Sequence, residues 1–165
     1  MSTAIDAAVD LLYREASHLD TQRWDDWLEL FTEDCEYWLP AWKGEHQMTA
    51  DPRREVSLIY YSSRAGLADR VWRVRQGNSA ASAVLPRTHH ALSNIRMASA
   101  DGEGPLLLES LWTVHQFLVR ESAVEVFFGR YEHTLVNRDG ALRIAKKKIV
   151  LLNDYLPAKI DFYSL

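Results

Sequence analysis

The sequence predicts an α+β domain in which N-terminal helices pack on a long, curved antiparallel sheet. Apolar residues in the first 31 positions recur every three or four residues, which is the period of an amphipathic helix. Residues 88–154 contain four long β-rich runs, separated by turn signals such as Asp139-Gly140. Helices followed by consecutive hairpins are typical of an α+β layout. We therefore expect the helices to fill the concave side of the sheet, which gives the domain the shape of a cone.

The helical part is expected to cover about residues 3–75. Ser2 or Thr3 is a suitable N-cap for a first helix, and Asp20 or Thr21 for a second. The apolar stripe of the first helix is Ile5, Val9, Leu12, Ala16 and Leu19. The apolar face of the second helix is Trp24, Trp27, Leu28 and Phe31.

A short strand is predicted from Cys35 to Leu39, because apolar and polar residues alternate there and Pro40 follows. Residues 41–54 contain Gly, Asp-Pro and polar residues, and they are predicted to form a loop. A third helix is expected to begin at Val56 and to continue to Val74. A second loop follows over residues 76–86.

The sheet part is expected over about residues 88–154, with strands near 88–98, 106–119, 123–136 and 141–153. Hairpin turns are predicted at Asp101-Gly102 and Asp139-Gly140. In the last run the apolar alternation changes face between Ile144 and Ile149, which predicts a bulge and a bent strand. Gly129 is interpreted as a similar kink in the preceding strand.

Composition restricts the function. The 165 residues are enough for one domain, 1–165, and 47% hydrophobic residues are enough for a packed core. A net charge of −4 argues against nucleic acid or an anionic membrane as the main partner. No apolar run approaches the roughly 20 residues of a membrane span, and no basic segment of a secretion signal is visible. We expect a cytoplasmic protein.

The ligand residues of common metal sites are missing. Cys35 is the only cysteine, which excludes an intrachain disulfide, a CxxC site and a self-contained iron–sulfur cluster. Acidic neighbours on both sides of Cys35 are expected to raise its thiol pKa, which disfavours a nucleophilic thiolate. His89 and His90 are adjacent on a predicted strand and therefore point to opposite faces. No two histidines and an acidic residue have a recognisable ligand spacing.

An acid–base pair inside the cone is one interpretation of the polar residues. Asp25 or Asp26 from the second helix would act with His90 or His115 from the sheet. The alternative is that both aspartates are solvated in a first helical turn, where negative charge is favoured in any case. The sequence supports no particular pair.

Charged clusters and the last residues are interpreted as contact surfaces. Lys146, Lys147 and Lys148 are expected to form a solvated patch or an interface rim. Four arginines near the third helix are expected to pair with carboxylates of a neighbouring element or subunit; they are Arg64, Arg70, Arg73 and Arg75. The largely apolar segment 155–165 is assigned to an interface, with packing on its own domain as the alternative.

Several strings resemble the small (β) subunit of aromatic-ring-hydroxylating dioxygenases, and the benzoate, toluate and anthranilate 1,2-dioxygenase type in particular. The resemblance runs from end to end of the chain. The strings are LYREA at 12–16, WDDWL at 24–28, YWLPAW at 37–42, SLIYY at 57–61, RAGLADRV at 64–71, RTHH at 87–90, SNI at 93–95 and FGRY at 128–131.

The resemblance implies an NTF2-like (cystatin-like) cone that works as a structural, non-catalytic subunit. It implies a large (α) subunit as partner, a trimer of this chain and an α3β3 hexamer. The large subunit would carry the Rieske [2Fe–2S] centre and the mononuclear iron, and a reductase would pass electrons from NADH. The assembly would add O₂ to an aromatic carboxylic acid and give a cis-diol. The resemblance implies no catalytic, cofactor-binding or metal-binding residue in this chain, since one cysteine cannot ligate a Rieske centre.

Two other functions stay open at this point. One is a stand-alone dehydratase or isomerase of the same fold, which would use an Asp–His pair in the cone. The other is a module that binds a ligand without chemistry.

Overall fold

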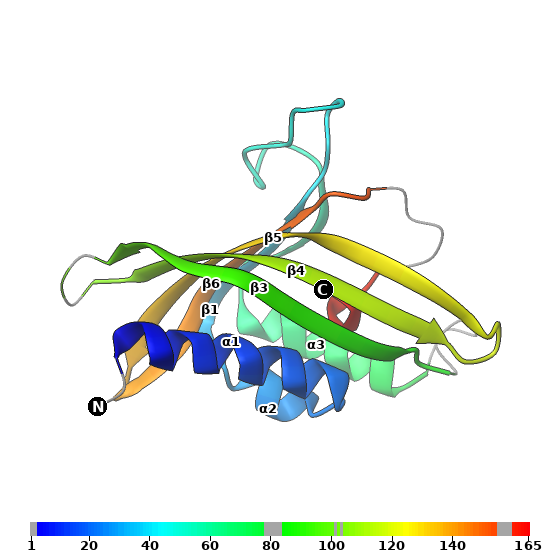
Figure 1. Ribbon diagram of the computed structural model, residues 1–165, viewed down its shortest axis with the longest axis horizontal. Helices are drawn as coiled ribbons and strands as arrows, with labels where there is room; N and C mark the ends of the chain where they lie inside the picture. The colour runs from blue at the N-terminus through cyan, green and yellow to red at the C-terminus, as the bar shows by residue number, and fades with distance from the viewer. Residues whose placement is uncertain (1–2, 78–83, 101, 103, 155–159) are drawn as a thin grey trace.

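One six-stranded sheet forms the frame of the molecule, in the order β2-β1-β6-β5-β4-β3 (Figure 1). The computed structural model describes residues 3–77, 84–100, 102, 104–154 and 160–165. The strands are β1 (Phe31–Pro40), β2 (Ser57–Tyr61), β3 (Arg87–Ala100), β4 (Leu106–Leu118), β5 (Ala123–Arg138) and β6 (Ala141–Leu151). The four long strands predicted in the second half of the chain are confirmed.

The sheet is mixed rather than wholly antiparallel. β1 and β6 run parallel to each other, whereas the other neighbouring strands are antiparallel. The parallel pair involves β1, for which the sequence predicted no partner strand. The four-strand meander is indeed antiparallel, but β1 enters the sheet beside its last strand, a long-range pairing that local patterns do not reveal.

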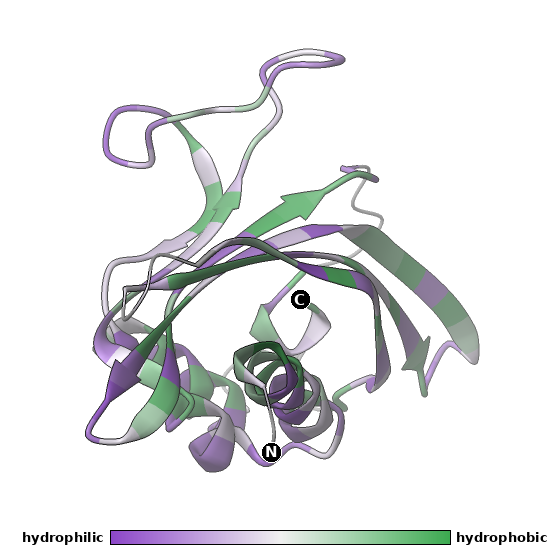
Figure 2. Cartoon of the chain, turned by 60° about the vertical axis from the view of Figure 1, so that its left-hand side comes forward, coloured by the Kyte–Doolittle hydropathy of each residue, from purple (hydrophilic) through white to green (hydrophobic). Residues whose placement is uncertain are grey.

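Helices lie on the concave side of the sheet, as predicted (Figure 2). They are α1 (Ala4–Asp20), α2 (Trp24–Leu28) and α3 (Arg64–Arg75), and a 3-10 turn, η2 (Phe162–Ser164), follows near the C-terminal end. Thr3 and Asp6 form a reciprocal capping box at the start of α1, which confirms Thr3 as the N-cap. Across the described residues, no helix is long and apolar enough to cross a membrane.

The predicted second and third helices need correction. α2 is only five residues long, its N-cap is Arg23 without a side-chain cap, and Phe31 already belongs to β1. The predicted third helix begins too early, because Ser57–Tyr61 forms β2 and α3 starts at Arg64 behind its N-cap Ser63. Short apolar runs fit either period, and here β-branched and aromatic residues favoured the strand.

Turns and bulges explain the path of the last strands. Asp139 and Gly140 both have positive φ, +53° and +78°, as a tight hairpin requires. Asp101 and residues 78–83 lie outside the described residues, although both positions were predicted as turn or loop. The pairing of β5 with β6 shifts between Thr134 and Leu135, which confirms the predicted bulge. Because of this shift, Lys147 shares the inner face with Ile144 and Ile149.

The core joins helices, sheet and the last residues. Phe162 stacks on Trp27 and makes an edge contact with Trp24, and Leu165 is fully buried. Residues 160–165 thus pack into the core of their own domain, which corrects the assignment of the whole segment 155–165 to an interface; residues 155–159 lie outside the described part. Loop 41–54 projects from the body (Figure 1), and a bridge between Trp42 and Met48 closes it.

Gly129 provides a test of this packing. A Cβ atom at this position would lie 1.8 Å from the main-chain oxygen of Val150 on β6. We expect Gly129→Ala to lower the free energy of unfolding by at least about 2 kcal/mol, because backbone rather than a flexible side chain must move. Urea unfolding would measure it. Gly44→Ala is the control, since no atom lies within 4 Å of its Cβ position; equal effects of the two substitutions would contradict the packing.

Candidate functional site

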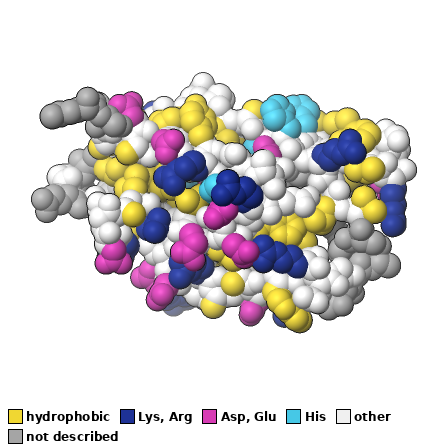
Figure 3. Space-filling view, turned by 90° about the horizontal axis from the view of Figure 1, so that it is seen from below, with side chains coloured by type: hydrophobic (Ala, Val, Ile, Leu, Met, Phe, Trp, Pro, Cys, Tyr) yellow, Lys and Arg dark blue, Asp and Glu magenta, His cyan; other side chains and the backbone are white. Residues whose placement is uncertain are grey.

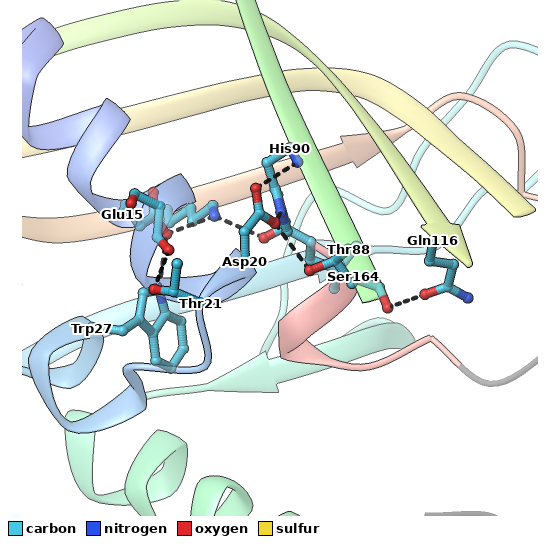
Figure 4. A network of polar contacts seen from close by, with 11 residues as sticks. Glu15, Asp20, Thr21, Trp27, Thr88, His90, Gln116 and Ser164 are labelled. Carbon is cyan, nitrogen blue, oxygen red and sulfur yellow. Dashed lines mark hydrogen bonds and ion pairs between the residues drawn. The ribbon is translucent and has the colours of Figure 1, made fainter. Parts of the chain in front are cut away.

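A charged network is buried between α1 and the sheet. Lys147 Nζ donates to Glu15 Oε1 over 2.7 Å, and His133 Nε2 lies 3.2 Å from Glu15 Oε2. Trp27 Nε1 also donates to Glu15, over 3.3 Å, as Figure 4 shows. Lys147 Nζ makes its second hydrogen bond to the main-chain oxygen of Leu165. One carboxylate thereby connects α1, α2, β5, β6 and, through Lys147, the last residues.

In this network, the neighbouring charges oppose the effect of burial on the pKa of each group. Burial alone would raise the pKa of Glu15, but Lys147 and His133 outweigh burial and lower it from 4.5 to about 2. Burial lowers the pKa of Lys147 and of His133, and Glu15 opposes both shifts. The Lys147 ammonium also lies 4.4 Å from the centre of the Tyr131 ring, a cation–π contact. The charges of the network are paired and buried, so we interpret the network as a stabilising element of the fold rather than as a catalytic site.

Sequence reasoning missed this network. Lys147 was assigned to a solvated patch or an interface rim, yet its side chain is only 1% exposed. Lys146 and Lys148 do lie on the outer side, where they pair with Glu36 and Glu132. The available signals were a glutamate within the apolar stripe of α1 and the change of strand face after Ile144. Either one indicates a charge that points inward.

An Asp–His pair does exist in the cone, but with a different aspartate. His90 Nδ1 lies 2.5 Å from Asp20 Oδ1, and the His90 amide and the Thr88 hydroxyl also donate to Asp20 (Figure 4). Burial would raise the pKa of Asp20, but these hydrogen bonds outweigh it and lower the pKa. Asp20 therefore does not cap α2 as predicted, because its carboxylate ties the end of α1 to β3.

The predicted acid–base candidates do not come together. Asp25 is exposed and pairs with Arg75, and Asp26 pairs with Arg23. His115 is exposed on β4 and lies opposite His89 of β3, with ring centres 6.1 Å apart. Only His90 of the four candidates is buried beside a carboxylate.

No described group of three or more His, Cys, Asp or Glu side chains could hold a metal ion. Cys35 is buried, and burial is the main cause that raises its thiol pKa to about 12. The predicted effect of the acidic neighbours contributes only through Asp34, and Arg64 opposes it. The donor set therefore does not fit a Rieske centre or a mononuclear iron site.

Three of the four arginines near α3 pair with carboxylates of neighbouring elements, as predicted. Arg70 binds Asp161 through both its Nε and its Nη2, which fixes the segment that carries η2. Arg75 pairs with Asp25. Arg64 donates to the main-chain oxygen of Phe31, with Glu29 and Glu33 within 4.0 Å. These arginines hold elements of this chain together.

The outer face of the sheet carries unusual apolar exposure. Along β4 and β5, side chains alternate between the core and the outside. We call the outward set the outer sheet face, which comprises Leu107, Leu111, His115, Val124, Val126, Phe128 and Arg130. Val124 is 62% exposed and Phe128 43%. Contiguous apolar side chains of this kind mark an interaction surface. Figure 3 shows the opposite, helical side, where charges of both signs intersperse the apolar side chains.

Removal of Lys147 tests the buried network. We expect Lys147→Met to lower the free energy of unfolding by about 3–5 kcal/mol, because it leaves the Glu15 carboxylate buried without its cation. The double variant Glu15→Gln/Lys147→Met should lose less of its free energy of unfolding, since no unpaired buried carboxylate remains. Chemical unfolding would measure both. Lys148→Met, on the outer side, is the matched control and should change stability by less than about 1 kcal/mol.

Acid should weaken the fold through the same groups. The pKa of Glu15 is lower in the folded chain than its ordinary value of 4.5, so its contribution is complete above pH 4.5 and is lost as the pH falls towards about 2. His133, with its pKa below 6.5, acts in the same direction at higher pH. Unfolding free energies measured from pH 7 to pH 3 should fall, and more steeply for the wild type than for Glu15→Gln/Lys147→Met. Parallel curves would contradict this assignment.

Comparison with known proteins agrees with this geometry. A family model described as "Ring hydroxylating beta subunit" matches residues 14–158. The toluate 1,2-dioxygenase subunit beta of Pseudomonas putida is 39% identical over 165 residues and covers 100% of both chains. The crystal structure of the benzoate 1,2-dioxygenase beta subunit of Burkholderia mallei has a TM-score of 0.80 and 33% identity, again over 100% of both chains.

A more distant likeness concerns the fold alone. The structure of a hexachlorocyclohexane dehydrochlorinase has a TM-score of 0.62 at 15% identity, over 88% of this chain and 82% of that one. This supports the cone-shaped NTF2-like fold without indicating an activity. With a matching family model over most of its length and a full-length relative at 39% identity, the chain belongs to the family of ring-hydroxylating dioxygenase beta subunits.

Proposed function

We propose that this chain is the structural, non-catalytic β subunit of the terminal oxygenase of a Rieske-type dioxygenase, and that its partner is a large α subunit. The single observation that carries the proposal is the end-to-end family match. Toluate and benzoate, named in the relatives, are both aromatic carboxylates, so we infer that the assembly adds O₂ to such an acid and gives a cis-diol.

The chemistry belongs to the partner in this proposal. The α subunit would hold the Rieske centre and the mononuclear iron, and electrons would come from NADH through a reductase. We infer that the system is cytoplasmic. The donor set of this chain supports this division, since its one cysteine is buried and its thiol pKa is raised. We infer that no residue of this chain acts in catalysis, cofactor binding or metal binding.

Self-association completes the proposal. We infer that three copies of this chain form a trimer and hold three α subunits, giving α3β3. The outer sheet face supports it, because exposed Val124, Val126 and Phe128 would be removed from water in such a contact.

Co-purification tests this proposal. A tagged copy of the chain is isolated from cells grown on an aromatic acid, and native mass and iron content are recorded together. We expect a complex several times larger than 19.0 kDa that contains iron, and no iron in the isolated chain. A lone, iron-free monomer of the chain in those cells would contradict it.

The Asp20–His90 pair is the reason to test a second function, that of a dehydratase or isomerase. In a stand-alone dehydratase or isomerase, His90 would remove a proton from the substrate. However, the His90 side chain is 1% exposed, and its carboxylate partner also ties α1 to β3. We therefore expect the chain alone to show no dehydration or isomerisation above background. A turnover that His90→Ala abolishes, while the fold persists, would favour the enzyme instead.

A further inference from the structure

One guanidinium on the outer sheet face has no partner. Arg130 of β5 lies directly across from Leu111 of β4, two residues from exposed Phe128. No hydrogen bond or ion pair joins Arg130 to any residue within the described part of the chain. It lines a surface hollow of about 360 Å³, together with Asn94, Arg96, Glu109, Ser110, Leu111, Tyr131 and Glu132.

The other charges of this hollow are already compensated. Arg96 pairs with Glu109 at 2.5 Å, and Glu132 accepts two hydrogen bonds of 3.1 Å from Lys148. Among the described residues, Arg130 is thus the one unpaired charge of the hollow, and Leu111 lies beside it. If the outer sheet face is buried against a protein, this guanidinium needs a carboxylate, because an uncompensated buried charge is strongly unfavourable.

We propose that Arg130 binds a carboxylate of a second copy of this chain, and that this pair sets how the two outer sheet faces meet. The inference rests on the proposed self-association and adds to it the residue that orients the contact. Guanidinium and carboxylate match in two parallel hydrogen bonds, which fix orientation as well as charge.

The chain carries suitable carboxylates at the rim of the same face. Glu121 lies in the turn between β4 and β5, three residues before Val124, and it is exposed. Asp154 follows Asn153, whose side chain hydrogen-bonds to the main chain of Val126 and Phe128. Neither carboxylate has an ion-pair partner in the described structure. A second copy placed against the face therefore offers the complementary charge that Arg130 lacks.

Charge reversal at Arg130 tests the pair. We expect Arg130→Glu to weaken self-association about 30-fold or more, measured by sedimentation or native mass over a range of concentrations. Arg130→Lys, which keeps the charge but loses the two-pronged geometry, should lose less. Arg138→Glu is the control, because Arg138 is another exposed arginine of β5 without an ion pair in the described residues, and it lies at the hairpin to β6. A cooperative thermal unfolding transition would confirm that each variant is folded.

A reciprocal reversal identifies the partner carboxylate. Glu121→Arg or Asp154→Arg, combined with Arg130→Glu, should restore association towards the wild-type value. If neither combination restores it, the proposed pair is wrong. If Arg130→Glu releases the α subunit while copies of this chain stay together, the occupant is the α subunit and the proposal is overturned.

The two proposals fail in different ways. A wild-type trimer that Arg130→Glu leaves intact overturns the Arg130 pair and leaves the β-subunit function in place. A wild-type chain that never contacts a second copy, even in the complex with the α subunit, overturns the proposed trimer and the pair with it.

Discussion

The rest of the structure depends on one constraint: the buried negative charge of Glu15 must be balanced by cations and hydrogen-bond donors around it. Glu15 sits on the inner side of α1, and its two oxygens meet Lys147, His133 and Trp27. Desolvation of a lone carboxylate would outweigh the packing that surrounds it, so α1 can occupy the cone only if β5 and β6 present their cations there. Helix position, strand register and the bulge before Lys147 are therefore parts of one arrangement. The segment at Leu165 joins it through the second bond of Lys147.

The features that local patterns determine could be predicted from the sequence. The cap and helical period of α1, the four long strands and the Asp139-Gly140 turn each follow from neighbouring residues. Of the predicted apolar stripe of α1, however, only Leu12 and Leu19 are fully buried. The features that were missed depend on distant contacts. Ser57–Tyr61 becomes a strand because it pairs with β1, and β1 runs parallel to β6 because the chain returns there after the meander. Neither pairing leaves a periodic signal in the sequence.

In the candidate site, too, only the features that depend on neighbouring residues could be predicted from the sequence. The adjacent histidines were expected to point to opposite faces, and His90 is buried while His89 is exposed. The aspartate that meets His90 could not be found, because Asp20 looks like a helix cap until β3 is placed beside it. The Lys146–Lys148 run was interpreted as a solvated patch or an interface rim, because a bulge is needed to turn its middle residue inward. Family strings identified the chain without explaining these residues, since they carry no information on which side chains face one another.

The parallel pairing of β1 with β6 has a consequence for the order of folding. Trp42, just beyond β1, donates to the main-chain oxygen of Leu151, 109 residues further along the chain. Glu15 and Lys147 are 132 residues apart, and Phe162 near the C-terminal end contacts the rings of both Trp24 and Trp27. During synthesis the N-terminal helices and β1 cannot make their contacts with β6 and the last residues until nearly the whole domain has been made. Contacts of such long sequence separation are slow to form. The nascent chain thus offers its apolar helices to solvent, and to chaperones, before it can offer any surface to a partner subunit.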